Sequence, residues 1–177
     1  MVGLGNPGSR YDGTRHNVGF AVVERLAQRW ELPAAKSKFN GRITQGRAGV
    51  GGPRIAILAP QTFMNEAGRS VGPARGSLQV ALDHVVVVHD EIDLGFGDVR
   101  TRLGGGLAGH NGLKSIAREC GGSDFARVRV GVGRPDSTDP DVVAGYVLAR
   151  FSELSAAVEA LVDQAADAVG ATLDGGL

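Results

Sequence analysis

The stretch His84-Val85-Val86-Val87-Val88-His89-Asp90 decides the fold of this chain. Its consecutive valines are β-branched and do not alternate with polar residues, a pattern typical of a central strand that is covered on both faces. The run ends at Asp90. Because ligand sites of α/β sheets lie beyond the carboxyl ends of the strands, this carboxylate is placed where a functional site is expected.

Strand-like and helix-like segments alternate on both sides of this run. Further strands are expected at Val2-Gly3-Leu4, 41–47, 54–59, 98–103 and 127–132, the last with valines alternating with Arg127 and Arg129. Helices are expected at 15–30 with Thr14 as N-cap, from about Asn65 to an interruption at Pro73, from Leu113 to Cys120, and at 152–169. This alternation predicts an α/β fold in which residues 1–177 form a single domain with helices packed on a mixed sheet.

The length and composition suit a cytoplasmic globular protein. A chain of 177 residues is large enough for one compact domain with a buried core. Cys120 is the single cysteine, so no internal disulfide forms, which suits a reducing compartment. No apolar run approaches the ~20 residues that cross a bilayer, and no charged-then-apolar leader opens the sequence. We therefore expect a cytoplasmic protein with no membrane partner.

Charge is distributed unevenly, although the formal net charge is zero. Residues 1–60 contain nine Lys and Arg against three Asp and Glu, and residues 121–177 contain four against nine. Such asymmetry can place a basic face on a neutral molecule, where it would bind a polyanion in a salt-sensitive way. On charge alone, an ordinary solvated surface is the simpler explanation.

The segment Gly3-Leu4-Gly5-Asn6-Pro7-Gly8 matches the dinucleotide-binding pattern G-x-G-x-x-G. That fingerprint requires a full strand before it and a helix that opens at its third glycine. Only two residues precede Gly3, and the segment 9–13 delays the helix. We therefore set a dinucleotide site aside.

The segment Gly68-Arg69-Ser70-Val71-Gly72 matches the nucleophile elbow G-x-S-x-G, and Asp90 and His110 follow in the order of a serine hydrolase. An elbow requires a strand that runs straight into the serine and a helix straight after it. The preceding Asn65-Glu66-Ala67 is not strand-like. A serine esterase that uses Ser70 is nevertheless the best rival enzyme hypothesis.

His89-Asp90-Glu91 together with His16 and His110 could suggest a metal site. The spacing is not that of a metal-binding helix such as H-E-x-x-H, and there is no thiolate pair. We expect no metal.

His16 is the strongest candidate for a catalytic base. It falls in the first turn of the helix expected at 15–30, where the positive end of the helix dipole disfavours imidazolium. A neutral histidine can accept a proton at neutral pH, as a general base must. Asp90 at its strand end could fix the histidine tautomer and stabilise the imidazolium that forms. Taken alone, His16 is better explained as a surface or capping histidine, and Asp90 is explained equally well as a helix cap or a loop acid.

Amide side chains and glycines accompany this pair in several loops. Asn6, Asn65 and Asn111 each lie beside glycine or proline turns, and as a set they could orient a carbonyl group and a water, since an amide both donates and accepts. Singly they are ordinary caps or turn formers. The glycine-rich segment 104–112 suits a flexible lid or a close backbone approach to a ligand, with a mobile loop as the alternative.

Together these segments resemble bacterial-type peptidyl-tRNA hydrolase. The resemblance rests on blocks that occur in the family's order and spacing over most of the chain. They are Gly3–Gly8, Tyr11, Thr14-Arg15-His16-Asn17-Val18-Gly19, Thr62-Phe63-Met64-Asn65, His89-Asp90-Glu91-Ile92-Asp93-Leu94, Gly104–Lys114 and Arg127–Pro135.

The resemblance implies a three-layer α/β/α fold around a mixed sheet, active as a monomer without cofactor or metal. It implies hydrolysis of the ester that joins a peptide to the 3′-terminal ribose of tRNA, with His16 activating water and Asp90 holding it in its basic form. Asn6 would help discriminate peptidyl-tRNA from free aminoacyl-tRNA. Contacts with the tRNA end or the peptide are implied for Tyr11, Phe63, Asn65 and Asn111, and Met64 and His110 would line the site.

The resemblance leaves two points open. A relative that binds RNA but has lost catalysis is an alternative, against which the retained His16 and Asp90 argue. Ala108 stands where the family usually has glycine, so we expect a stiffer loop before His110.

Overall fold

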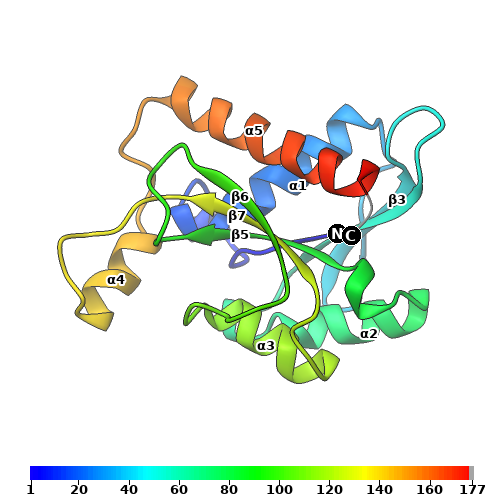
Figure 1. Ribbon diagram of the computed structural model, residues 1–177, viewed down its shortest axis with the longest axis horizontal. Coiled ribbons are helices and arrows are strands. Elements are labelled where there is room, and N and C mark those ends of the chain that lie inside the picture. Colours follow the sequence, from blue (N-terminus) through cyan, green and yellow to red (C-terminus); the bar gives the residue numbers. More distant parts are fainter. Residues whose placement is uncertain (176–177) are drawn as a thin grey trace.

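The computed structural model describes residues 1–175 as a seven-stranded mixed sheet between two layers of helices (Figure 1). The strands lie in the order β2-β3-β4-β1-β5-β7-β6. Their bounds are β1 Val2–Gly3, β2 Lys36–Lys38, β3 Gly41–Arg47, β4 Arg54–Pro60, β5 Val86–Glu91, β6 Val99–Leu103 and β7 Ala126–Gly131. β4, β1, β5 and β7 are parallel, whereas β2, β3 and β6 run antiparallel to their neighbours. The predicted three-layer α/β/α fold around a mixed sheet is confirmed.

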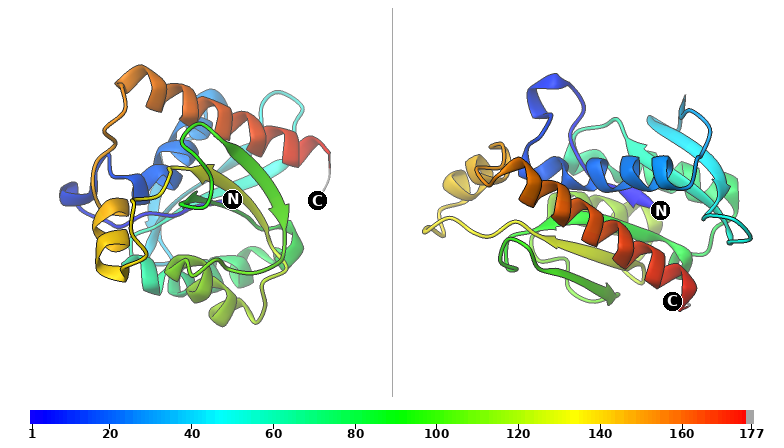
Figure 2. Two further views of the ribbon diagram at one scale, coloured as in Figure 1. Left: turned by 60° about the vertical axis from the view of Figure 1, so that its left-hand side comes forward. Right: turned by 90° about the horizontal axis from the view of Figure 1, so that it is seen from above.

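Two helices cover each face of the sheet. α1 (Val18–Arg29) and α5 (Ser155–Asp174) lie side by side on one face, and α2 (Gly68–Leu78) and α3 (Asn111–Cys120) cover the other (Figures 1 and 2). The shorter α4 (Pro140–Val147) lies near the carboxyl end of β5. Within residues 1–175, no helix combines the length and apolarity needed to cross a membrane.

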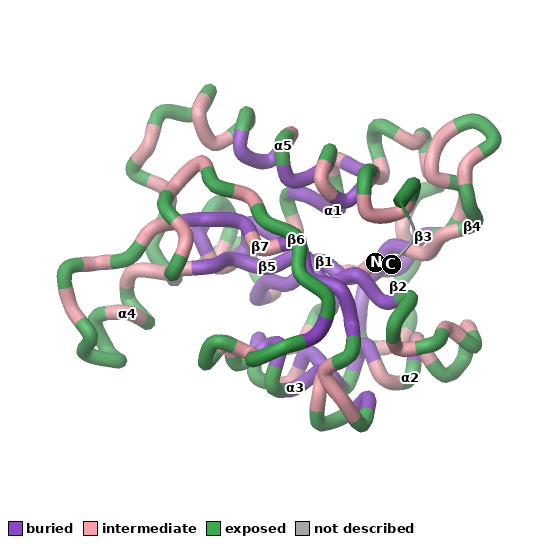
Figure 3. The backbone as a smooth tube through the Cα atoms, in the orientation of Figure 1, coloured by how far each residue is buried: buried purple, intermediate pink, exposed green. Residues whose placement is uncertain are grey.

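The valines of this run do not alternate with polar residues, because both faces of the strand are buried. Val86 and Val88 pack in the core formed with α1 and α5, whereas Val85 and Val87 pack in the core formed with α2 and α3. All residues of β5 are buried, as the tube coloured by exposure shows (Figure 3). The central strand predicted from this run is confirmed, but it begins at Val86, because residues Leu82–His84 form a 3-10 turn.

Two glycines allow α1 to lie directly against the centre of the sheet. A Cβ at Gly19 would lie 2.5 Å from the Leu4 nitrogen and from the Val88 oxygen, and a Cβ at Gly3 would lie 2.3 Å from the Gly19 oxygen. Real Cβ atoms do not come this close to backbone, so neither position accepts a side chain without moving the helix. This close approach places the start of α1 beside the carboxyl end of β5.

The helix predicted at 15–30 is divided in the structure. Arg15–Asn17 form a 3-10 turn, and the α-helix starts at Val18. Thr14, predicted as the N-cap, is the N-cap residue of this 3-10 turn, whereas Asn17 is the N-cap residue of α1. The Oγ1 of Thr14 donates to the Tyr11 oxygen (2.8 Å) and makes no capping hydrogen bond.

The predicted interruption at Pro73 is also wrong. After a 3-10 turn at Met64–Glu66, α2 runs from Gly68 to Leu78 through the proline. The carbonyl that loses its partner belongs to the exposed Arg69, where water can replace the missing hydrogen bond.

Candidate active site

His16 lies on the 3-10 turn that precedes α1, and its neighbour Arg15 fixes that turn. Arg15 is 4% exposed. Its guanidinium donates to the carbonyl oxygens of Tyr146 (3.3 Å) and Arg150 (2.9 Å) and lies 4.1 Å from the centre of the Tyr146 ring. The turn is thus tied to the end of α4, and the His16 ring has a defined position.

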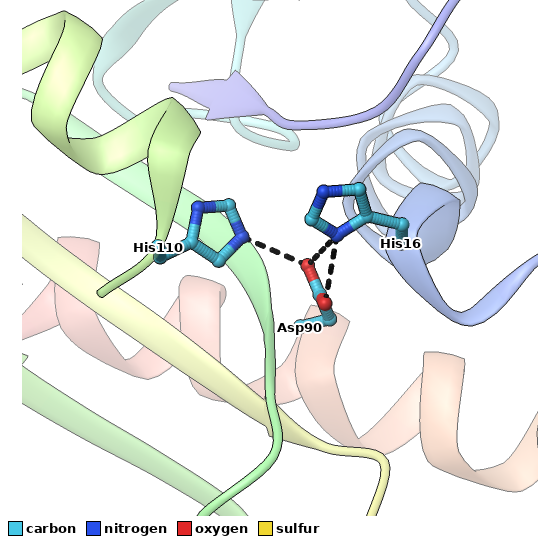
Figure 4. Close-up of side chains that lie close together, drawn as sticks. All are labelled: His16, Asp90 and His110. Atoms are coloured by element: carbon cyan, nitrogen blue, oxygen red, sulfur yellow. Dashed lines mark hydrogen bonds and ion pairs between the residues drawn. The ribbon is translucent and has the colours of Figure 1, made fainter. Parts of the chain in front are cut away.

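The His16 ring is held by Asp90, the residue that the sequence places near the end of the central strand. The Nδ1 of His16 lies 2.9 Å from Oδ1 and 2.8 Å from Oδ2 of Asp90 (Figure 4). An ionised carboxylate only accepts hydrogen bonds, so Nδ1 carries the proton. The Nε2 of His16 points away from Asp90 (Figure 4) and has the free lone pair that a general base requires.

His110 reaches the same carboxylate from the start of α3. Its Nε2 lies 2.9 Å from the Oδ1 of Asp90, and its Nδ1 accepts from the backbone N–H groups of Gly112 (3.2 Å) and Leu113 (3.4 Å). The two backbone donors require an unprotonated Nδ1, which fixes the proton on Nε2. His110 therefore caps α3 and donates to Asp90 at the same time.

Asp90 is ionised despite its burial. It is 3% exposed. Burial acts to raise the pKa of this carboxyl, but the hydrogen bonds from His16 and His110, together with the positive charge that either ring would carry when protonated, hold the pKa well below its usual range. The carboxylate can then stabilise a positive charge on His16 while a proton is being transferred.

A third imidazole, that of His89, packs behind this group. It is fully buried, and its Nδ1 donates to the carbonyl oxygen of Asp90 (2.8 Å). Its ring meets the His110 ring edge to face at 5.0 Å. Burial lowers the pKa of His89 to about 3, so its ring is neutral at physiological pH.

Asn6 is locked in one orientation by buried hydrogen bonds. Its backbone N–H donates to the Oδ1 of Asn17 (2.8 Å), and its carbonyl accepts from the Nδ2 of Asn17 (2.9 Å). Its side-chain Oδ1 accepts from the backbone N–H of Met64 (2.7 Å). Because Oδ1 is engaged, Nδ2 is the atom of Asn6 that is left to donate to a ligand.

A cavity of about 550 Å³ opens over these groups. Most of the predicted site residues line it, namely Asn6, His16, Phe63, Met64, Asn65, Asp90, His110 and Asn111. Phe63 is 58% exposed, so much of its aromatic ring is accessible to a ligand. Tyr11 lies outside the cavity, in the 3-10 turn Ser9–Tyr11, so its predicted contact with substrate requires a ligand that extends beyond the cavity.

The apolar wall opposite these polar groups comes from α4, which was not predicted. Val143, Ala144, Val147 and Leu148 contribute to this wall. Asp139 caps α4 by accepting from the Asp141 N–H (2.8 Å), and Pro140 is its first residue. An acidic N-cap followed by proline is a recognised signal for a helix start, and it could have revealed α4. The structural roles of Arg15 and Asn17 could not be predicted, because their hydrogen-bond partners lie in other segments of the chain.

The serine-esterase hypothesis is contradicted by the position of Ser70. This serine lies inside α2 rather than between a strand and a helix, is fully buried, and does not line the cavity. Among the described residues, the cavity lining contains no serine, threonine or cysteine. The described cavity lining therefore offers no side-chain hydroxyl or thiol as a nucleophile.

One group in residues 1–175 could hold a metal ion. The ligand atoms of His16, Asp90 and His110 all lie within 4.8 Å of one another. The nitrogens that would bind the metal carry the protons donated to Asp90, so an ion would have to displace both protons. The absence of a metal stays a prediction.

The fold and the site together define a class of protein: an α/β/α protein whose cavity holds a histidine bound to a buried carboxylate. The family model of peptidyl-tRNA hydrolase matches residues 1–177. The chain is 49% identical over 162 residues to a peptidyl-tRNA hydrolase from Methylocella silvestris, covering 91% of this chain and 80% of that protein. A peptidyl-tRNA hydrolase from Geobacillus thermodenitrificans is 46% identical, with coverage of 95% and 89%.

Solved structures agree with this match. The crystal structure of peptidyl-tRNA hydrolase from Acinetobacter baumannii superposes with a TM-score of 0.84 at 38% identity, covering 98% of this chain and 85% of that one. The chain belongs to the peptidyl-tRNA hydrolase family.

Proposed function

We propose that this chain hydrolyses the ester between the peptide and the 3′-terminal ribose of peptidyl-tRNA, with His16 as the general base. Family membership supports the substrate. The observation that supports this mechanism is the contact between His16 and Asp90. It leaves the Nε2 of His16 free, and His16 lines the cavity. A retained base of this kind argues against a relative that only binds RNA.

The reaction follows from the groups in the cavity. Nε2 of His16 takes a proton from water while the water oxygen attacks the ester carbonyl carbon, and Asp90 stabilises the imidazolium that forms. As the tetrahedral intermediate collapses, its bond to the ribose 3′-oxygen breaks and that oxygen takes the proton from His16. The products are a peptide with a free carboxyl group and tRNA with a free 3′-hydroxyl. The amide of Asn65 or Asn111 is the candidate donor to the oxyanion.

The two sides of the cavity suit the two parts of the substrate. The α4 wall offers apolar contact without directional bonds, which suits peptide side chains of varied sequence. The open ring of Phe63 can stack against a base of the single-stranded tRNA end. Nδ2 of Asn6 would donate to a carbonyl of the peptide and would repel the free ammonium group of an aminoacyl-tRNA.

Exposed cations supply a surface for the tRNA phosphates. Arg25 and Arg29 of the basic N-terminal third are ion-paired with acids of α5, so they are poor candidates. Arg100, Arg102 and Lys114 are exposed on β6 and α3, close to the glycine-rich segment. We infer that RNA affinity depends on these three residues and falls with salt.

The proposed enzyme is a cytoplasmic monomer that forms a single domain and needs neither metal nor cofactor. Ester hydrolysis by an activated water requires a base and an oxyanion donor, and the cavity lining offers candidates for both in His16 and in the amides of Asn65 and Asn111. Incubation with a purified peptidyl-tRNA tests the function: release of intact tRNA and free peptide supports it. Lack of cleavage, with substrate bound, would contradict it.

A further inference from the structure

Arg127 is a buried cation that the reaction does not use. It lies on β7 with 1% exposure and is the largest fully buried side chain of the described residues. Within residues 1–175 no carboxylate forms an ion pair with it, because the nearby Glu91 binds Arg129 (3.0 Å). Burial, followed by the charges of Arg102 and Arg129, lowers its pKa. Such a group is costly to bury unless its N–H groups find acceptors.

The acceptors are two carbonyl groups of one loop. Nη1 donates to the Gly106 oxygen (2.7 Å) and Nη2 to the Gly104 oxygen (2.5 Å). Gly104 and Gly105 have φ values of 59° and 85°, a conformation that favours glycine. Because residues 105 and 106 are exposed, the planar guanidinium is a principal tether of this loop, together with the half-buried Leu107.

This loop, residues 104–109, runs directly into the active site. It connects β6 to α3 (Figure 1), and Ala108 and Gly109 line the cavity. The next residue is His110, which donates to Asp90 and caps α3. A shift of loop 104–109 would therefore move both a wall of the cavity and a donor to the catalytic carboxylate.

We propose that Arg127 is a positioning residue that holds loop 104–109 so that His110 stays on Asp90. It acts through the loop, and it touches neither the cavity nor the reacting atoms. This inference rests on the proposed function for its kinetic part, whereas the position of the loop can be measured independently.

The test compares Arg127→Met, Arg127→Lys and the control Arg29→Met. Methionine keeps most of the buried volume, carries no charge that must be desolvated, and donates no hydrogen bond to Gly104 or Gly106. We expect Arg127→Met to lower kcat/KM on peptidyl-tRNA roughly 10- to 100-fold. Amide hydrogen exchange should speed up in loop 104–109 while the protection of β5 stays unchanged.

The lysine variant and the control separate positioning from general stability. Lysine keeps the charge and can reach one carbonyl, so its kcat/KM and loop exchange should both lie between wild type and Arg127→Met. Arg29→Met removes an arginine paired with acids of α5 and should leave both readouts unchanged. The proposal would be overturned if Arg127→Met kept the wild-type kcat/KM. It would also be overturned if, in both Arg127 variants, β5 lost as much protection from hydrogen exchange as loop 104–109. If wild type fails to cleave peptidyl-tRNA, the proposed function fails, and loop exchange still decides whether Arg127 holds the loop.

Discussion

The Nδ1 of His16 lies 2.8 Å from the Oδ2 of Asp90, although 74 positions separate the two residues in the chain. This contact joins the turn before α1 to the end of β5. It fixes which ring nitrogen of His16 carries the proton, and so it leaves the other nitrogen able to accept one. The proposed chemistry depends on this one pair.

Replacement of Asp90 by asparagine should abolish most catalysis and spare binding. The amide cannot stabilise a positive charge on His16, and its N–H₂ group, if turned toward Nδ1, favours the wrong tautomer. We expect kcat to fall by roughly 10³- to 10⁴-fold, as for other carboxylate–histidine pairs. Single-turnover rates and the Kd for peptidyl-tRNA would show this. A large loss of tRNA affinity in Asp90→Asn would contradict the role given to Asp90.

His89 should make the fold sensitive to acid. Its pKa in the folded protein is about 3, against about 6.5 for an exposed histidine. As pH falls from about 6.5 towards 3, the unfolded chain takes up a proton that the folded protein does not, so His89 lowers the free energy of unfolding by roughly 1.4 kcal/mol per pH unit.

Urea unfolding of His89→Gln between pH 4 and 7.5 checks this contribution. The variant should show a shallower loss of stability with acid than wild type. His84→Gln is the matched control, because the His84 side chain is 74% exposed, and it should follow the wild-type curve. Parallel curves for wild type and His89→Gln would show that His89 does not carry the effect.

Substitution of Asn6 by aspartate should weaken discrimination between substrates. Aspartate keeps an oxygen for the Met64 N–H and replaces the free Nδ2 donor by a second oxygen, which repels a peptide carbonyl and attracts a free ammonium group. The ratio of kcat/KM for an N-acetylated aminoacyl-tRNA over the free aminoacyl-tRNA should fall at least about 10-fold, or ~1.4 kcal/mol. An unchanged ratio would show that Nδ2 of Asn6 does not read this part of the substrate.

Removal of metal ions should leave activity intact. The ring nitrogens of His16 and His110 that face Asp90 carry protons, and the reaction proposed for His16 needs no Lewis acid. Wild-type enzyme dialysed against a chelator should cleave peptidyl-tRNA at its original rate. Loss of activity that returns on adding a divalent ion would instead assign the His16, Asp90 and His110 group to a metal.

The sequence predicts the centre of the fold better than its edges. The valine run is apolar enough on both faces to identify β5, whereas β2 is three residues long, polar and exposed, so only its pairing with β3 defines it. The alternation in β7 suggests that Arg127 faces solvent with Arg129. The structure buries Arg127 instead, because the carbonyls of loop 104–109 supply acceptors that no local pattern reveals.

The candidate site, like the fold, could be predicted from the sequence only in part. The pairing of His16 with Asp90 could be predicted, because a carboxylate at a strand end can orient a histidine and stabilise its protonated form. The double role of His110 could not be predicted, because it requires both Asp90 and the first turn of α3 within reach of one ring. Ala108, expected to stiffen its loop, lies at a φ of 50°, where glycine is usual.

The most direct measurement compares wild type, His16→Ala and Ser70→Ala on one purified peptidyl-tRNA, with cleavage rate and binding followed in parallel. Ser70 is buried in α2 and away from the cavity, so Ser70→Ala should cleave at the wild-type rate, and no acyl-enzyme should accumulate. His16→Ala should bind the substrate with near wild-type affinity and cleave it at least about 10³-fold more slowly. Cleavage by His16→Ala at close to the wild-type rate would contradict the assignment of His16 as the base.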